Sequence, residues 1–227
     1  MNARTIMTAA TAIAIGLCLS SCVIVKKSEH RNGKDDKLVT RNISLSDFNS
    51  ISNEFIADVK YTQGPTSFTV SAPQYILDRL SVEVRDSVLV IGNNKDDGRI
   101  NDVPNVKVTC SSPNLKSVNV DGMGDFEWKG GTAGNLKLVV NGMGDLKWED
   151  GHCESLEMYI NGMGDIECKN ITGNSIIGAV EGHGDIEISG SFVSGRLSIE
   201  GLGDIDAKKL DCPALSTSVD GMGKIKR

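Results

Sequence analysis

The chain has few aromatic residues and no strongly basic stretch. Phe, Trp and Tyr make up only 4% of its 227 residues, and the formal net charge is −6. An acidic balance without a basic stripe argues against a nucleic-acid partner. A scarcity of large rings is typical of cores that are one side chain deep, which Val, Ile and Leu can fill.

Helical periodicity is also missing from residues 40–227, apart from one or two turns that we expect at 74–80. In its place, a short glycine phrase occurs six times. The copies are Asp121-Gly-Met-Gly-Asp125, Asn141-Gly-Met-Gly-Asp145, Asn161-Gly-Met-Gly-Asp165, Glu181-Gly-His-Gly-Asp185, Glu200-Gly-Leu-Gly-Asp204 and Asp220-Gly-Met-Gly-Lys224. Their first glycines are 20, 20, 20, 19 and 20 residues apart. A fixed period near twenty residues predicts stacked structural units, each too small to bury its own apolar face.

Apolar and charged residues alternate on both sides of each phrase. The apolar sets are Val120, Val140, Ile160, Val180, Ile199 and Val219 before it, and Phe126, Leu146, Ile166, Ile186, Ile205 and Ile225 after it. A period of two indicates β-strands. The pattern therefore predicts an all-β fold, a single-stranded parallel β-helix (β-solenoid) with coils of about 20 residues. At a spacing of about 4.8 Å, six coils would form a rod about 29 Å long.

The paired glycines fall on the inward side of each corner. We expect a Cβ there to collide with the packed interior, and we expect glycine to supply the positive φ that a corner needs. A phosphate-binding glycine loop would have to open a helix, whereas each phrase here runs into a strand. We therefore reject nucleotide binding.

The first residues read as a targeting signal rather than as part of the fold. Arg4 precedes an apolar run, and Leu19-Ser20-Ser21-Cys22 follows it. We interpret 1–21 as a signal peptide whose end resembles the lipobox of bacterial lipoproteins, which implies cleavage after Ser21 and lipidation of Cys22. Residues 22–39 are then a flexible polar tether. This organisation predicts a lipid-anchored, palmitate-carrying protein of the bacterial cell envelope, with the outer membrane favoured by family analogy.

Residues 40–227 form the predicted β-helical domain. The part before the repeats, 40–114, also reads as strands, and we expect irregular early coils that cap the stack. The regular part, 115–227, contains the six repeats.

Five sequence pieces occur in a characteristic order. They are Phe48-x-x-Ile51, Val59-Lys-Tyr-Thr-Gln-Gly64, Leu77-x-x-Leu80, Val88-Leu-Val-Ile91 and Leu115-Lys-Ser-Val-Asn-Val-Asp-Gly-Met-Gly-Asp125. Together they resemble the putative auto-transporter adhesin head, GIN domain family, over about 40–227. The resemblance implies a right-handed parallel β-helix and an exported location, and it implies no established activity. The family often has Ser between the two glycines, where this chain has Met, His or Leu.

An acidic row follows the glycines. It comprises Asp125, Asp145, Asp165, Asp185 and Asp204, and Lys224 takes the sixth place. Stacked carboxylates repel, and Ca²⁺ relieves such repulsion in β-rolls with Gly-x-Gly-x-Asp repeats. Those repeats are nine residues long, however, and Asp also caps corners by accepting neighbouring N–H groups. We favour structural corner aspartates, with calcium as the alternative, and we expect no cofactor.

A second row lies between the paired glycines. It comprises Met123, Met143, Met163, His183, Leu202 and Met222. Strict alternation places these side chains outward, where Met forms adaptable contact surfaces. We regard this row as the candidate interaction surface, for a protein or glycan ligand. Binding of a soft metal such as Cu(I) is the weaker alternative.

Four further cysteines follow Cys22, namely Cys110, Cys153, Cys168 and Cys212. Of the pairings available, Cys153–Cys168 is the one worth testing as a disulfide. Trp128 and Trp148 share an inward position in adjacent repeats, where we expect them to stack as an aromatic plug, with a sugar-binding platform as the less favoured reading.

Catalysis is not expected. His30, His152 and His183 are scattered, and no pairing of nucleophile and base is evident. Carbohydrate-cleaving β-helix enzymes need long loops from several coils to build a groove, whereas these repeats differ in length by at most one residue. We therefore predict a binding, adhesion or structural module, with a calcium-stabilised module and, less favoured, a carbohydrate-active enzyme as alternatives.

Overall fold

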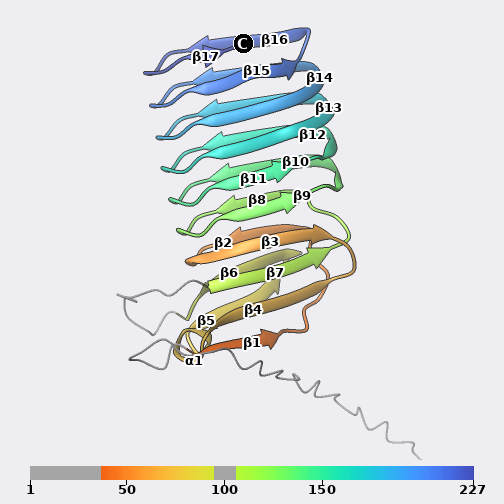
Figure 1. Cartoon of the computed structure of the whole chain (residues 1–227), viewed down its shortest axis with the longest axis vertical. Coiled ribbons are helices and arrows are strands. Elements are labelled where there is room, and N and C mark those ends of the chain that lie inside the picture. The colour runs from red at the N-terminus through yellow and green to blue at the C-terminus, as the bar shows by residue number, and fades with distance from the viewer. Residues whose placement is uncertain (1–36, 95–105) are drawn as a thin grey trace, which may run out of the picture.

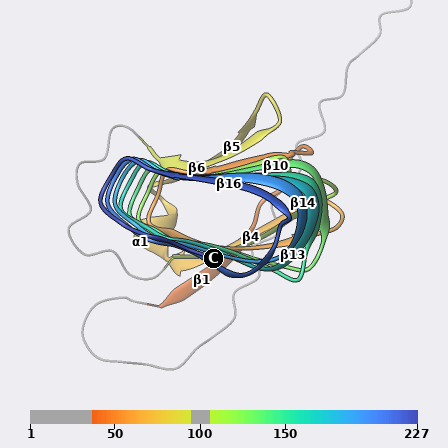
Figure 2. The same cartoon turned by 90° about the horizontal axis from the view of Figure 1, so that it is seen from above.

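A computed structural model describes residues 37–94 and 106–227. The strands stack into one parallel β-solenoid, with β1 at one end and β17 at the other (Figure 1). Viewed along the stack, the coils superimpose as a flattened ring from which β5 points away (Figure 2). The predicted parallel β-solenoid with coils of about 20 residues is therefore confirmed.

Six regular coils form the C-terminal part of the stack. Their strands are β8 (Ser117–Val120), β9 (Phe126–Lys129), β10 (Thr132–Val140), β11 (Leu146–Glu149), β12 (His152–Ile160), β13 (Ile166–Val180), β14 (Ile186–Ile199), β15 (Ile205–Asp211), β16 (Ala214–Val219) and β17 (Ile225–Lys226). Each coil pairs in parallel with the next, and β13 and β14 continue around the bend that separates two strands elsewhere.

Residues of equal phase lie directly above one another, as the repeat predicted. Val140 pairs with both Val120 and Ile160, and Ile166 pairs with both Leu146 and Ile186. All six side chains are buried, with Ile186 1% exposed and the other five 0% exposed. Each apolar row therefore forms a continuous strip of the core, and a coil buries its interior only because its neighbours cover it.

An aromatic stack fills the core where the repeats begin. The Trp128 and Trp148 rings stack with their centroids 4.7 Å apart and an interplanar angle of 12°. Tyr61 of β3 (Ala57–Gln63) meets Trp128 edge-on at 5.2 Å. Both indoles are buried, so the predicted aromatic plug is confirmed, and a role as an exposed sugar platform is not compatible with their position.

The N-terminal part is less regular, as expected, but its order in space differs from its order in the chain. It contains β1 (Leu38–Asn42), β2 (Ser50–Asn53), β3, β4 (Ser67–Pro73), α1 (Gln74–Leu77), β5 (Leu80–Arg85), β6 (Val88–Asn93) and β7 (Val106–Ser112). The coil of β2 and β3 lies between β6–β7 and β8–β9, although β6 and β7 follow it in sequence. The first strand begins at Leu38, slightly before the predicted domain start at 40.

Antiparallel strands close this end of the stack. β4 pairs antiparallel with β7, and β1 pairs antiparallel with β4. Phe68, Val70, Ile76 and Leu77 of β4 and α1 are buried beneath them. An open solenoid end exposes a row of unpaired backbone groups and an apolar layer, and these reversed strands cover both.

The corner glycines are required mainly because the backbones of successive coils lie close together. A Cβ on Gly142 would lie 1.9 Å from the carbonyl oxygen of Gly122, and a Cβ on Gly162 would lie 2.2 Å from that of Gly142. The collision is thus with the backbone of the preceding coil rather than with the apolar interior. None of these three glycines has a positive φ. Positive φ is thus not needed at every corner, although the second glycines of two later corners, Gly184 and Gly203, have φ of 159° and 151°.

Positive φ also occurs at the opposite corner of the coil. Gly130, Asp150 and Asn170 have φ of 73°, 57° and 56°. The Asn170 side-chain amide donates to the Asp150 carboxylate at 3.0 Å. Asn and Asp tolerate this conformation better than other residues with a Cβ, and their side chains bond locally.

The clash at the glycine corner gives a direct test of the stack. We expect Gly162→Ala to lower the free energy of unfolding by about 3 kcal/mol or more, because three backbone atoms of the preceding coil lie within 2.5 Å of the new Cβ. Gly134→Ala is the matched control, since its Cβ would meet only a Glu154 carboxylate oxygen at 4.0 Å. The control should change stability by no more than about 1 kcal/mol. Urea unfolding of both variants measures the difference in the free energy of unfolding. An equal loss of stability in the two variants would contradict the proposed packing.

Candidate functional site

Each glycine corner projects one side chain away from the solenoid. Backbone hydrogen bonds of 2.8–2.9 Å join successive corners, from the Met143 N–H to the Gly122 carbonyl and from the Met163 N–H to the Gly142 carbonyl. The side chains between the glycines therefore form a row along the stack, which we call the corner ridge. Its members are Met123, Met143, Met163, His183, Leu202 and Met222.

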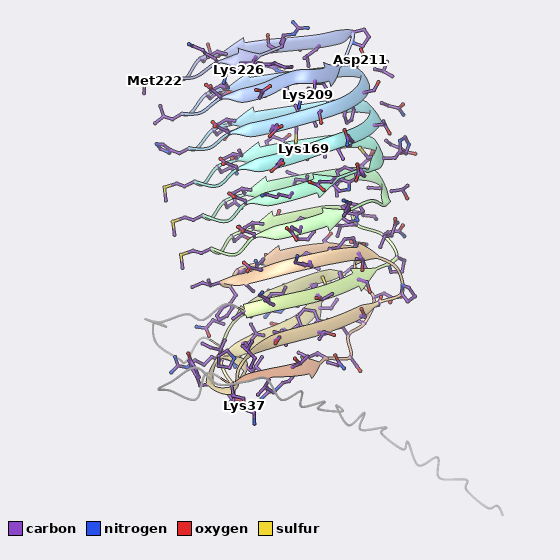
Figure 3. The ribbon with its side chains drawn as sticks, in the orientation of Figure 1. Lys37, Lys169, Lys209, Asp211, Met222 and Lys226 are labelled. Atoms are coloured by element: carbon purple, nitrogen blue, oxygen red, sulfur yellow. The ribbon has the colours of Figure 1, made fainter. Side chains whose placement is uncertain are left out.

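The corner ridge is largely exposed. The exposed fractions are 47% for Met123, 49% for Met143, 60% for Met163 and 71% for Met222. His183 is exposed and Leu202 is half-buried. Met222 extends from the last corner away from the strands (Figure 3). The predicted outward orientation is thus observed, while a role of the ridge in binding remains a prediction.

The aspartate row on one side of the ridge is a chain of hydrogen bonds between coils. The Asp125 carboxylate accepts the Asp145 backbone N–H at 2.9 Å, and the Asp145 carboxylate accepts the Asp165 N–H at 2.9 Å. The same bond continues through Asp185 and Asp204 at 2.8 and 2.6 Å, and Asp204 accepts the N–H of Lys224 at 2.9 Å. Each carboxylate thus satisfies a corner N–H of the next coil. The aspartates therefore have the structural role that we favoured.

A second polar row flanks the ridge on its other side. The Asn141 side-chain amide donates to Asp121 at 2.6 Å, and that of Asn161 donates to Asn141 at 2.8 Å. The Ser52 hydroxyl extends the row by donating to Asp121 at 3.1 Å. A side-chain amide next to a carboxylate donates a hydrogen bond, whereas a second carboxylate in its place would repel the first. The sequence pattern showed these residues as polar, but their bonding to one another was not foreseen.

Charged side chains on the strands after the corner pair with one another across coils. Lys60 lies 2.8 Å from Glu127, Lys147 lies 3.6 Å from Glu167, and Lys169 bridges Glu167 and Glu187. The hydrogen bond between Lys60 and Glu127 lowers the pKa of the carboxyl and raises that of the amine. Exposed pairs of this kind add little stability. Their main effect is that the described part of this face presents mixed charge rather than a single sign.

The end of the aspartate row is also paired with a cation. Lys226 lies 2.8 Å from Asp204. The hydrogen bond from Lys226, followed by the backbone N–H of Lys224, lowers the pKa of Asp204. The two lysines of the last coil, Lys224 and Lys226, thus offset the negative charge that accumulates along the row.

The four described cysteines are buried free thiols, so the Cys153–Cys168 disulfide is not present in the structure. Burial raises the pKa of Cys110 and Cys153 to about 12, and it raises the pKa of Cys168 as well. A thiol must be deprotonated to act as a nucleophile. These cysteines are therefore core residues without the character of catalytic groups.

The described histidines are separated, as the sequence indicated. The His152 ring nitrogen lies 2.9 Å from the Thr172 hydroxyl, whereas His183 belongs to the corner ridge. Among residues 37–94 and 106–227, no group of three or more His, Cys, Asp or Glu side chains is placed to hold a metal. In the same residues, no helix is long and apolar enough to cross a bilayer. The predicted signal peptide, Cys22 and most of the predicted tether lie outside the described residues.

The chain matches the family described as "Putative auto-transporter adhesin, head GIN domain" over residues 47–226. Among curated proteins, none matches it significantly. A putative adhesin from Bacteroides fragilis is similar in structure, with a TM-score of 0.67 and 25% identity, over 84% of this chain and 96% of that one.

Two further solved structures share the fold. A putative lipid binding protein from Parabacteroides distasonis has a TM-score of 0.66 and 21% identity, over 83% of this chain and 96% of that one. A putative adhesin from the same species has a TM-score of 0.58 and 20% identity, over 85% and 97%.

The hydrogen bonds of the aspartate row predict how single substitutions rank. Asp165→Ala leaves the Asp185 N–H without its acceptor and should cost about 1–2 kcal/mol. Asp165→Asn keeps a carbonyl oxygen at the same place and removes one like charge, so we expect stability close to that of the native chain. Urea unfolding in EDTA and in millimolar Ca²⁺ measures both variants. If calcium held the row together, Asp165→Asn would instead abolish a Ca²⁺-dependent gain in stability.

Proposed function

Because the chain belongs to the family of putative auto-transporter adhesin head, GIN domains, we propose that it is a non-catalytic binding module of the bacterial cell envelope. In this proposal the protein is a lipoprotein anchored through Cys22, and the corner ridge contacts a protein or glycan partner. The outer membrane is the proposed location.

Family membership supports an envelope or surface location, and the similarity to the Bacteroides fragilis putative adhesin supports an adhesive role. The lipid anchor rests on the sequence alone, because an apolar leader ends in Leu19-Ser20-Ser21-Cys22. One acyl chain binds a membrane only marginally, whereas two signals anchor stably, so lipidation at Cys22 would need more than one chain to hold the rod.

The observation that carries the binding role is the exposure of the corner ridge. Four methionines, each about half exposed or more, recur at one position in a stack whose other apolar rows are buried. Met is flexible and polarizable, so a row of Met side chains adapts to a partner surface. The flanking rows include Asp121, Asp125 and Glu181, which are exposed. Apolar contact in the middle and negative charge at the rim favour a partner with an apolar strip bordered by basic or hydroxyl groups.

The lipid anchor is tested by one substitution. We expect Cys22→Ser to abolish incorporation of labelled palmitate and to release the protein from the membrane fraction, because the acylated sulfur is lost. Cys18→Ser is the matched control, since Cys18 lies in the apolar leader before the cleavage point. The control should remain labelled and membrane-bound. Retention of label and membrane association by Cys22→Ser would contradict the anchor.

The ridge is tested by placing charge on it. Cells that display the full chain, or its Met143→Asp/Met163→Asp variant, are bound to immobilised envelope glycans and proteins. We expect the variant to bind about tenfold less or weaker still, because two central contacts become charged. Val193→Asp is the control, since Val193 is 66% exposed but lies in the middle of β14, away from the glycine corners. Equal binding by all three forms would overturn the assignment of the ridge.

A further inference from the structure

Four successive corners of the ridge carry soft metal ligands, starting at Met123, and the last three of them bring thioether and imidazole groups together. Met143, Met163 and His183 occupy the same position in adjacent coils. Backbone hydrogen bonds hold these corners in register, from the Met163 N–H to the Gly142 carbonyl and from the His183 N–H to the Gly162 carbonyl, both at 2.8 Å. We propose that this segment of the ridge binds a soft monovalent cation of the Cu(I) class. The inference goes beyond the proposed binding role and does not depend on it.

The spacing of the coils suits a metal held between neighbouring corners. Bonds from a metal to sulfur and to imidazole nitrogen are about 2.3 and 2.1 Å long, so a metal between one thioether and one imidazole separates them by at most about 4.4 Å. Adjacent coils are about 4.8 Å apart. Met163 and His183 can therefore share one ion with small side-chain adjustments. The long, flexible side chain of Met143 can supply a third ligand from the coil below.

These ligands are available for binding. Met143 and Met163 are 49% and 60% exposed, and His183 is exposed. In the described part of the chain, no hydrogen bond engages the His183 imidazole, in contrast to His152, whose ring contacts Thr172. Neutral imidazole and thioether are the ligand types that soft ions prefer. The site is thus composed of accessible groups that other contacts do not occupy.

The charge around these corners favours a cation. Asp145, Asp165, Glu181 and Asp185 lie within two residues of the three ligands. Fixed negative charge raises the local concentration of cations. The aspartates already accept backbone N–H groups, and carboxylates are hard ligands that suit Mg²⁺ and Ca²⁺ better than Cu(I). Selectivity for a soft ion therefore comes from the ridge, while the aspartates supply the attractive field.

The last coil provides an internal control. Met222 is 71% exposed, but its neighbour along the ridge is Leu202, which cannot ligate a metal. Lys224 follows two residues later and opposes a cation. The same residue type is thus present at the same corner position without a second soft ligand beside it.

Silver ion tests the proposal without redox chemistry, because Ag⁺ has the same charge and ligand preference as Cu(I). The full chain, labelled with ¹³C at the methionine methyl groups, is titrated with silver nitrate in chloride-free buffer and followed by NMR. We expect the methyl signals of Met143 and Met163 to shift first and that of Met222 to remain in place. Met163→Leu and His183→Asn should each weaken this binding about tenfold or more, and Met222→Leu should leave it unchanged.

Cysteine thiols also bind silver ion, but this contribution is the same in every variant because no variant alters a cysteine. Simultaneous shifts of all four exposed methionines would show non-specific thioether binding and would overturn the proposal. An unchanged affinity in both Met163→Leu and His183→Asn would do the same. Circular dichroism of each variant verifies that the strands persist.

Discussion

The close approach of successive backbones at the glycine corner is the constraint on which the structure depends. The carbonyl of Gly122 lies where a Cβ of Gly142 would be, and the N–H of Met143 bonds to that same carbonyl. One coil therefore rests on the next without an intervening side chain. Register follows from this contact, because a shift of one residue would place a side chain where only glycine fits. Each outward residue of the corner is then stacked above its equivalent in the coil below.

Stacking of equivalent residues has opposite consequences inside and outside the solenoid. Inside, rows such as Val140 on Val120 multiply apolar contact, and a thin core becomes continuous. Outside, equal charges would accumulate at a spacing of about 4.8 Å. The structure relieves this accumulation with amides, as at Asn141, with acceptance of backbone N–H groups by each aspartate, and with lysines at the last coil. The corner can therefore carry many acidic residues and remain ordered.

The same repetition gives the corner ridge a row of similar side chains at a fixed spacing. A single exposed Met contributes a weak contact, but a row of them at fixed spacing offers several weak contacts that act together. In the proposed binding role, such a surface would suit an extended or repetitive partner, since each added coil adds one more contact. It also brings soft ligands within reach of one another, although the residues concerned are 20 positions apart in the chain. Adhesive and metal-binding properties would thus both arise from one geometric cause.

The repeat by itself determined the parallel solenoid, the inward rows, the stacking of Trp128 on Trp148 and the outward direction of the ridge. All of these follow from the length of the repeat and from the alternation of inward and outward residues, and both are visible in the sequence. Only the tertiary structure decided the order of the N-terminal strands, where β2 and β3 lie between coils that follow them in sequence. Strands outside the repeat have no recurring position in the sequence from which the neighbouring strand could be predicted. The reason for the glycines, and the path of the aspartate hydrogen bonds from coil to coil, likewise depend on distances between backbones, and no local pattern encodes those distances.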